Sequence, residues 1–183
     1  CYVVAVDAQN KSKDEIEVDN YIEFNLNKGL PDLNYNEFDY ILLLDVIEHL
    51  KNPEKFMELL KKRIDKNPKI TVIISTPNIG FIVIRLMLLF GSFNYGNKGI
   101  LDKTHTRLFT FSSFKNLLLQ GGFKIINISG VPVPLPLITG NNKIGNILLR
   151  INKILIFLMK TIFSYQIFSL IRPNTSIELL LDQ

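Results

Sequence analysis

Short hydrophobic runs recur along the chain, and each has the length and the β-branched or aromatic content of a strand. Several are apolar at successive positions, which is typical of strands buried on both faces of a parallel sheet. The predicted strands are Tyr2–Val6, Tyr21–Asn25, Phe38–Leu44, Lys69–Ser75, Phe123–Ile128 and Ser164–Ile171.

Segments with helical spacing lie between these runs. In the first of them, Asn52 is a candidate N-cap and Pro53 suits the first turn of a helix. The predicted helices are Pro53–Asp65, Ile79–Phe90, a helix that is capped by Ser112 or Ser113 and ends at Gly121-Gly122, and Ile144–Lys160. The alternation of strand and helix predicts an α/β fold with a parallel sheet that is covered on both faces.

The length of 183 residues suits one domain over residues 1–183. With a single cysteine, Cys1, no internal disulfide can form, which favours a reducing, cytoplasmic setting. One Cys and two His predict no Cys/His metal cluster, although carboxylate sites stay open. No apolar stretch reaches the roughly 20 residues of a membrane span.

The net charge of +4 combines −8 over residues 1–60 with +12 over residues 61–183. A basic, apolar half suits an acidic ligand, an anionic lipid surface or nucleic acid, and it is equally compatible with one positive face of an ordinary fold. Nucleic-acid binding is not expected, because the lysines are not interleaved with aromatic residues in one stripe.

Polar residues stand where the predicted strands end. Ligands of open parallel sheets bind beyond the carboxyl ends of the strands, and there a carboxylate such as Asp7 can accept hydrogen bonds from ribose hydroxyls. Asp7 can equally well end the strand without binding a ligand. The only two histidines, His49 and His105, both fall on loops at this edge, where they are candidates for catalysis or for structural roles.

Three segments resemble one family. Asp45-Val46-Ile47-Glu48-His49-Leu50-Lys51-Asn52-Pro53 resembles the segment that follows strand four of class I S-adenosylmethionine-dependent methyltransferases, and Ser75-Thr76-Pro77-Asn78 fits the same group. The third, Leu101-Asp102-Lys103-Thr104-His105-Thr106-Arg107-Leu108-Phe109-Thr110, is similar to the branch found in polysaccharide and lipid-linked glycan gene clusters.

The resemblance implies a Rossmann-like, doubly wound α/β fold whose seven-stranded, mainly parallel sheet has an antiparallel last strand. It also implies methyl transfer, with S-adenosyl-L-methionine as cofactor. It also implies site residues. Those expected at the cofactor are Asp7, Ala8, Asn25, Leu26, Asp45 and Val46. His105, and after it His49, are the candidate general bases, while Arg107 and Asn78 are candidates for acceptor binding. For Arg107 an ion pair with Asp102 is the structural alternative.

One family feature is missing. The glycine-rich loop and the strand before it should precede Tyr2, so we expect the true N-terminus to lie upstream. The alternative is a non-catalytic Rossmann-like module that has lost its cofactor loop. A nicotinamide-dependent oxidoreductase would share Asp7 but would not explain the Asp45–His49 segment.

Residues 79–110 and 138–162 are expected to be insertions or cap helices, and the acceptor is expected to be a small molecule, a sugar or a lipid-linked compound. On the Ile144–Lys160 helix, Arg150, Lys153 and Lys160 belong to one narrow basic stripe in an otherwise apolar surface. Either this helix is sandwiched between the sheet and the Ile79–Phe90 helix, or it makes peripheral contact with an anionic membrane.

Overall fold

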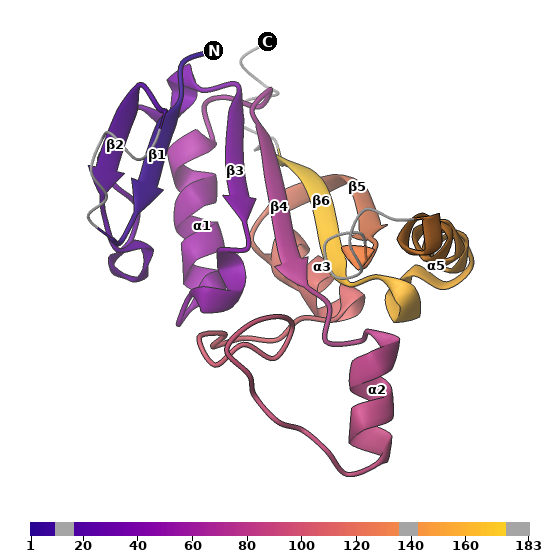
Figure 1. Cartoon of the computed structure of the whole chain (residues 1–183). Coiled ribbons are helices and arrows are strands. Elements are labelled where there is room, and N and C mark those ends of the chain that lie inside the picture. Colours follow the sequence, from indigo (N-terminus) through magenta and orange to yellow (C-terminus); the bar gives the residue numbers. More distant parts are fainter. Residues whose placement is uncertain (10–16, 136–142, 175–183) are drawn as a thin grey trace.

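The computed structural model describes residues 1–9, 17–135 and 143–174 (Figure 1). Its strands are β1 (Val4–Asp7), β2 (Asn20–Glu23), β3 (Tyr40–Leu44), β4 (Thr71–Pro77), β5 (Phe123–Val131) and β6 (Gln166–Pro173). Its α-helices are α1 (Pro53–Ile64), α2 (Ile82–Leu89), α3 (Phe111–Gln120) and α5 (Lys143–Phe163), and short 3-10 turns are η2 (Leu26–Lys28), η3 (Tyr35–Glu37) and η4 (Ile47–His49).

The predicted strands and helices are all present, with ends displaced by a few residues. The Asn52 side chain caps α1 by accepting a hydrogen bond from the Lys55 N–H at 2.9 Å, as expected. The expected cap of α3 is wrong, because Thr110 fills that position in place of Ser112 or Ser113. Thr110 and Ser113 exchange backbone and side-chain hydrogen bonds in a capping box.

The strands form two sheets, with order β1-β2 in one and β3-β4-β6-β5 in the other. The pairs β1/β2 and β3/β4 are parallel, whereas β6 runs antiparallel to both β4 and β5. The mainly parallel α/β fold with an antiparallel last strand is therefore confirmed. In the described ranges, β1 lies at an edge of the two-stranded sheet and β3 at an edge of the four-stranded sheet.

Helices α1 and α3 pack against the same face of the β3-β4-β6-β5 sheet, and most of the core lies there (Figure 1). Gly121 lets them meet, because a Cβ at that position would lie 2.9 Å from the Cβ of Met57 on α1. On the opposite face, Tyr40, Leu42 and Leu44 of β3 are about half exposed or more. The fully buried apolar side chains include Ile47, Met57, Ile64, Ile74, Phe114, Leu118, Ile167 and Ile171.

The segment between β4 and α3 leaves the main body and returns to it. Helix α2 projects beyond the carboxyl ends of the strands, and the loop after it runs back beneath β3 and β4 (Figure 1). A second, small cluster made of Phe81, Ile84, Ile100 and Leu101 packs this segment together. Its role as an insertion or cap stays a prediction, and part of the other expected insertion, residues 138–142, lies outside the described residues.

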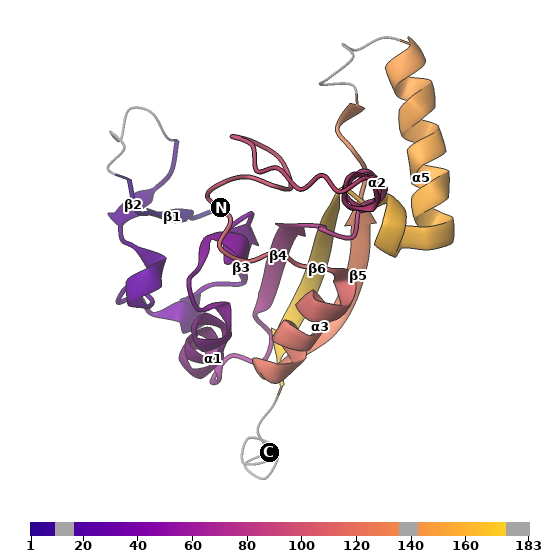
Figure 2. The same cartoon turned by 90° about the horizontal axis from the view of Figure 1, so that it is seen from below.

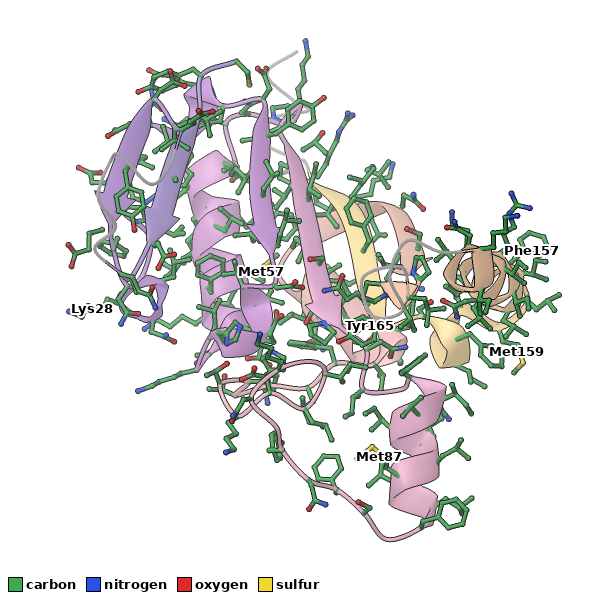
Figure 3. The ribbon with its side chains drawn as sticks, in the orientation of Figure 1. Lys28, Met57, Met87, Phe157, Met159 and Tyr165 are labelled. Carbon is green, nitrogen blue, oxygen red and sulfur yellow. The ribbon has the colours of Figure 1, made fainter. Side chains whose placement is uncertain are left out.

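Helix α5 packs against β5 at the end of the sheet and then stands away from it (Figure 2). Phe157 and Met159 lie on its outer side, with exposed fractions of 88% and 51% (Figure 3). The expectation that this helix is sandwiched between the sheet and α2 is therefore wrong, since most of its apolar side chains are uncovered. In the described ranges no helix combines the length and hydropathy that crossing a membrane requires.

Candidate active site

The carboxyl ends of β1, β3 and β4 lie at one edge of the molecule, and the loop of residues 91–109 runs along it (Figure 1). Asp7 is the last residue of β1, and Asp45 directly follows β3. Turn η4 begins two residues later and places Glu48 and His49 at the same edge. The topology therefore gathers the predicted strand-end residues where parallel sheets bind ligands.

Asp45 is fixed by its neighbours on two strands. Its backbone has a positive φ of 53°, which is uncommon outside glycine. Its carboxylate accepts hydrogen bonds from the Ser75 hydroxyl at 3.1 Å and from the Gln166 side-chain amide at 2.9 Å to each oxygen. Val46, the residue before η4, follows this sharp bend. Asp45 thus sets the direction in which the chain leaves β3 for η4.

The loop that carries His105 is hydrogen-bonded directly to η4. The backbone N–H groups of Thr106 and Arg107 both donate to the carbonyl oxygen of Glu48, at 2.9 and 3.1 Å. The Thr106 hydroxyl lies 3.1 Å from that same oxygen and 2.8 Å from the carbonyl oxygen of Leu50. These contacts join two segments that are more than 50 residues apart in sequence.

The two histidine rings meet as a result. Their centroids are 4.8 Å apart with an interplanar angle of 64°. The Nδ1 atom of His49 lies 3.1 Å from the Thr104 carbonyl oxygen, and that of His105 lies 3.0 Å from the Ile100 carbonyl oxygen. Because a carbonyl only accepts, each Nδ1 carries a proton, and Nε2 is the atom of each ring that is left for another partner.

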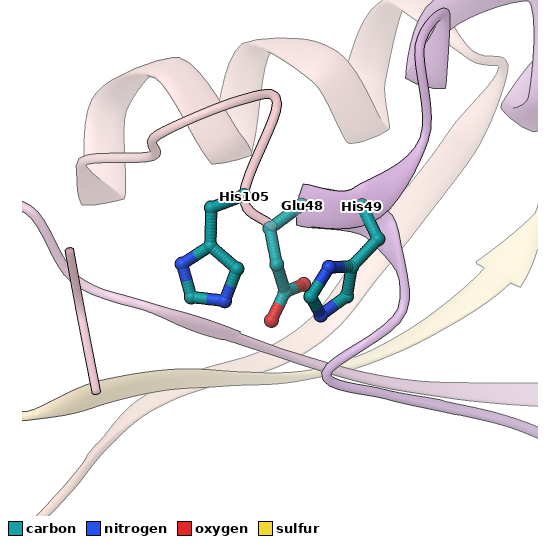
Figure 4. Close-up of side chains that lie close together, drawn as sticks. All are labelled: Glu48, His49 and His105. Carbon is teal, nitrogen blue, oxygen red and sulfur yellow. The ribbon is translucent and has the colours of Figure 1, made fainter. Parts of the chain in front are cut away.

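Glu48 lies between the two rings in the close-up of Figure 4, with an exposed fraction of 1%. Within the described part of the chain, neither carboxylate oxygen makes a hydrogen bond of standard geometry. Burial raises the pKa of Glu48 to about 7. Its own backbone N–H and the nearby Thr76 hydroxyl lower that pKa, and the Asp45 carboxylate adds to the increase.

Asp102 shapes the loop on the other side of the histidines. Its carboxylate accepts hydrogen bonds from the Thr104 hydroxyl at 2.7 Å and the Thr104 N–H at 2.8 Å. These bonds lower the pKa of Asp102, and the charges of His105 and His49 lower it further. An ionised carboxylate therefore stands beside the histidine pair.

The predicted cofactor residues lie at the same edge. Asp7 is partly buried at the end of β1, Ala8 follows it at the surface, and the Asp7 carboxylate accepts a hydrogen bond from the Gln9 N–H at 2.9 Å. Asn25 follows β2, the neighbour of β1, and its side-chain oxygen accepts a hydrogen bond from the Asn27 N–H at 2.9 Å. Leu26 opens η2 and lines a cavity of about 90 Å³ between η2 and the start of α1.

The two predicted acceptor residues are engaged in other contacts. Arg107 pairs with Glu54 at the start of α1, so the expected alternative of an ion pair with Asp102 is wrong. Asn78 is fully buried, and its amide donates to the carbonyl oxygens of Thr161 and Ser164 at 3.1 and 2.9 Å. These contacts give Asn78 a structural role, that of joining the end of β4 to the end of α5.

Sequence reasoning missed Glu48 as a site residue. The Glu48 side chain becomes buried without a partner only when the loop that carries His105 folds over it, and no local sequence pattern shows this. The available signal was that a carboxylate directly precedes one of only two histidines. The sequence predicted no Cys/His metal cluster and left carboxylate sites open, and the structure places both histidines beside this carboxylate.

Comparisons with known proteins bear on this geometry. Residues 2–128 match the family model described as a methyltransferase domain. No relative is found among the curated proteins. The chain resembles the S-adenosylmethionine-dependent methyltransferase from Mesorhizobium loti with a TM-score of 0.56 and 14% identity, covering 93% of this chain and 80% of that one.

Two further solved structures are similar. A SAM-dependent methyltransferase from Archaeoglobus fulgidus has a TM-score of 0.50 and 16% identity, with 93% of this chain and 75% of that one covered. The small RNA methyltransferase HEN1 has a TM-score of 0.56 and 16% identity, and the match covers 94% of this chain but only 20% of HEN1. At such identities the structures show the fold, which is Rossmann-like. The family match covers more than half of the chain, and this protein therefore belongs to the methyltransferase domain family.

Proposed function

We propose that this protein transfers a methyl group from S-adenosylmethionine to a hydroxyl group of an acceptor. Membership of the methyltransferase domain family supports methyl transfer and implies this cofactor. The observation that carries the proposal further is the histidine pair. The loop with His105 is bonded to η4, so both imidazoles lie at the strand edge where Asp7 and Asp45 end their strands.

The donor set at β1 and β2 fits the nucleoside end of the cofactor. The Asp7 carboxylate would accept hydrogen bonds from the ribose hydroxyls, and Ala8 would border the ribose. Asn25 would face the adenine amino group through its side-chain oxygen, without the charge assistance that an aspartate would give, and Leu26 would pack on the ring. Asp45 and Val46 would line the adenosine and methionine edge of the site.

When bound, S-adenosylmethionine supplies a methyl group that is already activated by its positive sulfur. What the chain must supply is alignment of the acceptor and a destination for the proton of its hydroxyl. The Nε2 lone pair of His105 can accept this proton, and His49 is the second candidate. The acceptor oxygen would gain the methyl group as the donor's sulfur–methyl bond breaks.

The acceptor is proposed to be a small molecule, a sugar or a lipid-linked compound. A glycan-cluster role rests on the resemblance of residues 101–110 alone. The similar protein HEN1 is described as a small RNA methyltransferase, so the expectation of no nucleic-acid partner has no support from the comparisons. Arg107 can contact an anionic acceptor only if its ion pair with Glu54 breaks.

The uncovered surface of α5 supports peripheral membrane contact, with the protein proposed to be cytoplasmic. Ile144, Ile154 and Leu158 are each more than 60% exposed. Lys143, Arg150 and Lys153 on the same helix suit anionic headgroups, each contributing about 1 kcal/mol near such a surface. A lipid-linked acceptor would then meet the site from the membrane.

Calorimetry with S-adenosylhomocysteine tests the proposal on the full-length protein. Asp7→Ala should weaken binding roughly thirty- to a hundredfold, since it removes charge-assisted hydrogen bonds worth about 2–3 kcal/mol. His105→Ala should leave this affinity nearly unchanged, because the histidine belongs to the acceptor side. Equal affinity of Asp7→Ala and parent would remove Asp7 from the site, and no binding by a folded parent would favour the non-catalytic module.

A further inference from the structure

One buried group at the strand edge has no partner that explains its burial. The Glu48 carboxylate is 99% buried, and its two oxygens make no standard hydrogen bond to any described residue. A buried carboxylate without hydrogen bonds or a counter-charge costs several kcal/mol in a typical protein. A ligand that brings positive charge would offset this cost.

The atoms around Glu48 are metal-ligand atoms. One carboxylate oxygen of Glu48 and one ring nitrogen each of His49 and His105 all lie within 4.8 Å of one another. A cation about 2.1 Å from each of three ligands sets them about 3.4 Å apart. The three side chains, shown in Figure 4, therefore have to move closer together when they bind one ion.

The surroundings also orient the histidines for this role. Each Nδ1–H donates to a backbone carbonyl, Thr104 for His49 and Ile100 for His105, so Nε2 is the nitrogen of each ring that can bind a metal ion. Histidines that bind metal commonly donate their other ring N–H in this way. The hydrogen bonds from the Thr106 and Arg107 N–H groups to the Glu48 carbonyl oxygen hold the two segments that carry the ligands next to each other.

The charge and the ligand types restrict the ion. Asp45 and Asp102 place further negative charge near the cluster. Two imidazoles with one carboxylate suit Zn²⁺ and similar divalent transition metals, whereas Mg²⁺ prefers oxygen ligands alone. Three protein ligands leave a coordination position open, as in catalytic zinc sites.

We propose that Glu48, His49 and His105 form a binding site for a divalent transition-metal ion of the Zn²⁺ type. Its role rests on the proposed methyl transfer: a cation at the open position would hold the acceptor oxygen and lower the pKa of its hydroxyl, whose proton then leaves to water. In the metal-bound protein His105 is a ligand and no longer a free base. The binding of the ion itself needs neither cofactor nor acceptor.

The test uses the full-length protein without a histidine tag, in a Cys1→Ser background so that the exposed thiol cannot bind the probe. Calorimetry with Zn²⁺ should show one equivalent bound. Glu48→Gln should lower the affinity by about a hundredfold, while the matched control Glu58→Gln, at an exposed position of α1, should leave it unchanged. The conservative Glu48→Gln variant removes a buried charge and is therefore expected to fold.

Proton NMR gives a second readout through His49 and His105, the two histidines of this sequence. Zn²⁺ should shift the Cε1–H signals of both rings in the parent. Absence of Zn²⁺ binding, or equal binding by Glu48→Gln and parent, would overturn the metal site. Zn²⁺ binding by a protein that does not bind S-adenosylhomocysteine would refute only the proposed function, and the reverse result would refute only the metal site.

Discussion

Replacing Thr106 by valine should loosen the contact that brings the two histidines together. The Thr106 hydroxyl lies between two carbonyl oxygens, 2.8 Å from Leu50 and 3.1 Å from Glu48. Its single proton is shared between them, and valine has nearly the same shape but no hydroxyl. The loss of one such bond costs about 1 kcal/mol. The backbone bonds from Thr106 and Arg107 to Glu48 remain, so the loop should stay attached.

Two assays check this expectation. Urea unfolding should give a free energy of unfolding lower by about 1 kcal/mol with an unchanged m-value. The nuclear Overhauser effect between the ring protons of His49 and His105, whose centroids are 4.8 Å apart, should weaken, because the loop samples longer separations.

Thr104→Val is the matched control. It also removes a threonine hydroxyl bond from this loop, but that bond goes to Asp102 within the loop and not to η4. The ring-to-ring effect should therefore persist. If Thr106→Val keeps both the stability and the ring-to-ring effect of the parent, the bridge between loop and η4 does not position the histidines.

Four further predictions concern the fold and its surfaces. Thr110→Ala should lower the free energy of unfolding by about 1 kcal/mol in urea, because it removes the α3 cap; an unchanged value would contradict the capping box. Gly121→Ala should lower the free energy of unfolding by about 1–3 kcal/mol, because the added methyl group would press against α1. Gly96→Ala should lower it less in the same assay, because the nearest atom to its added methyl group would be 3.7 Å away. Burial raises the pKa of Tyr35 from 10.0 to about 12, so its contribution to stability is complete below pH 10 and is lost as the pH rises through 12. Between pH 10 and 12, the free energy of unfolding of Tyr35→Phe should therefore fall less steeply with pH than that of the parent. Anionic vesicles should co-sediment the protein at low salt and release it at high salt, and a protein that stays in the supernatant at low salt would refute the lipid contact of α5.

Much of the fold could be predicted from the sequence because its signals are local. The apolar runs identified the strands, and Asn52 with Pro53 marked the start of α1. The α3 cap was misplaced by sequence reasoning because Ser112, Ser113 and Thr110 are all good capping residues, and only the backbone shows which lies before the first turn. The position of α5 could not be predicted either, since its apolar residues fit burial and exposure equally well.

The candidate site could be predicted in part. Strand ends and loop histidines follow from the order of the elements, so Asp7, Asp45 and His49 were expected at one edge. The pairing of His49 with His105 depends on hydrogen bonds between distant segments, which a single sequence does not show. The burial of Glu48 and the bond from Arg107 to Glu54 likewise arise only when the loop folds onto η4.

Chemical-shift mapping with S-adenosylhomocysteine tests the central claim most directly, because it reports where the cofactor product binds. Titration of the isotope-labelled full-length protein should shift the backbone signals of Asp7, Asn25 and residues 45–49, at the carboxyl ends of the strands. A cavity of about 140 Å³ at the opposite ends, lined by Tyr40, Thr71 and Arg172 among others, should not respond. Shifts gathered at that cavity, or no shifts at all, would contradict the account.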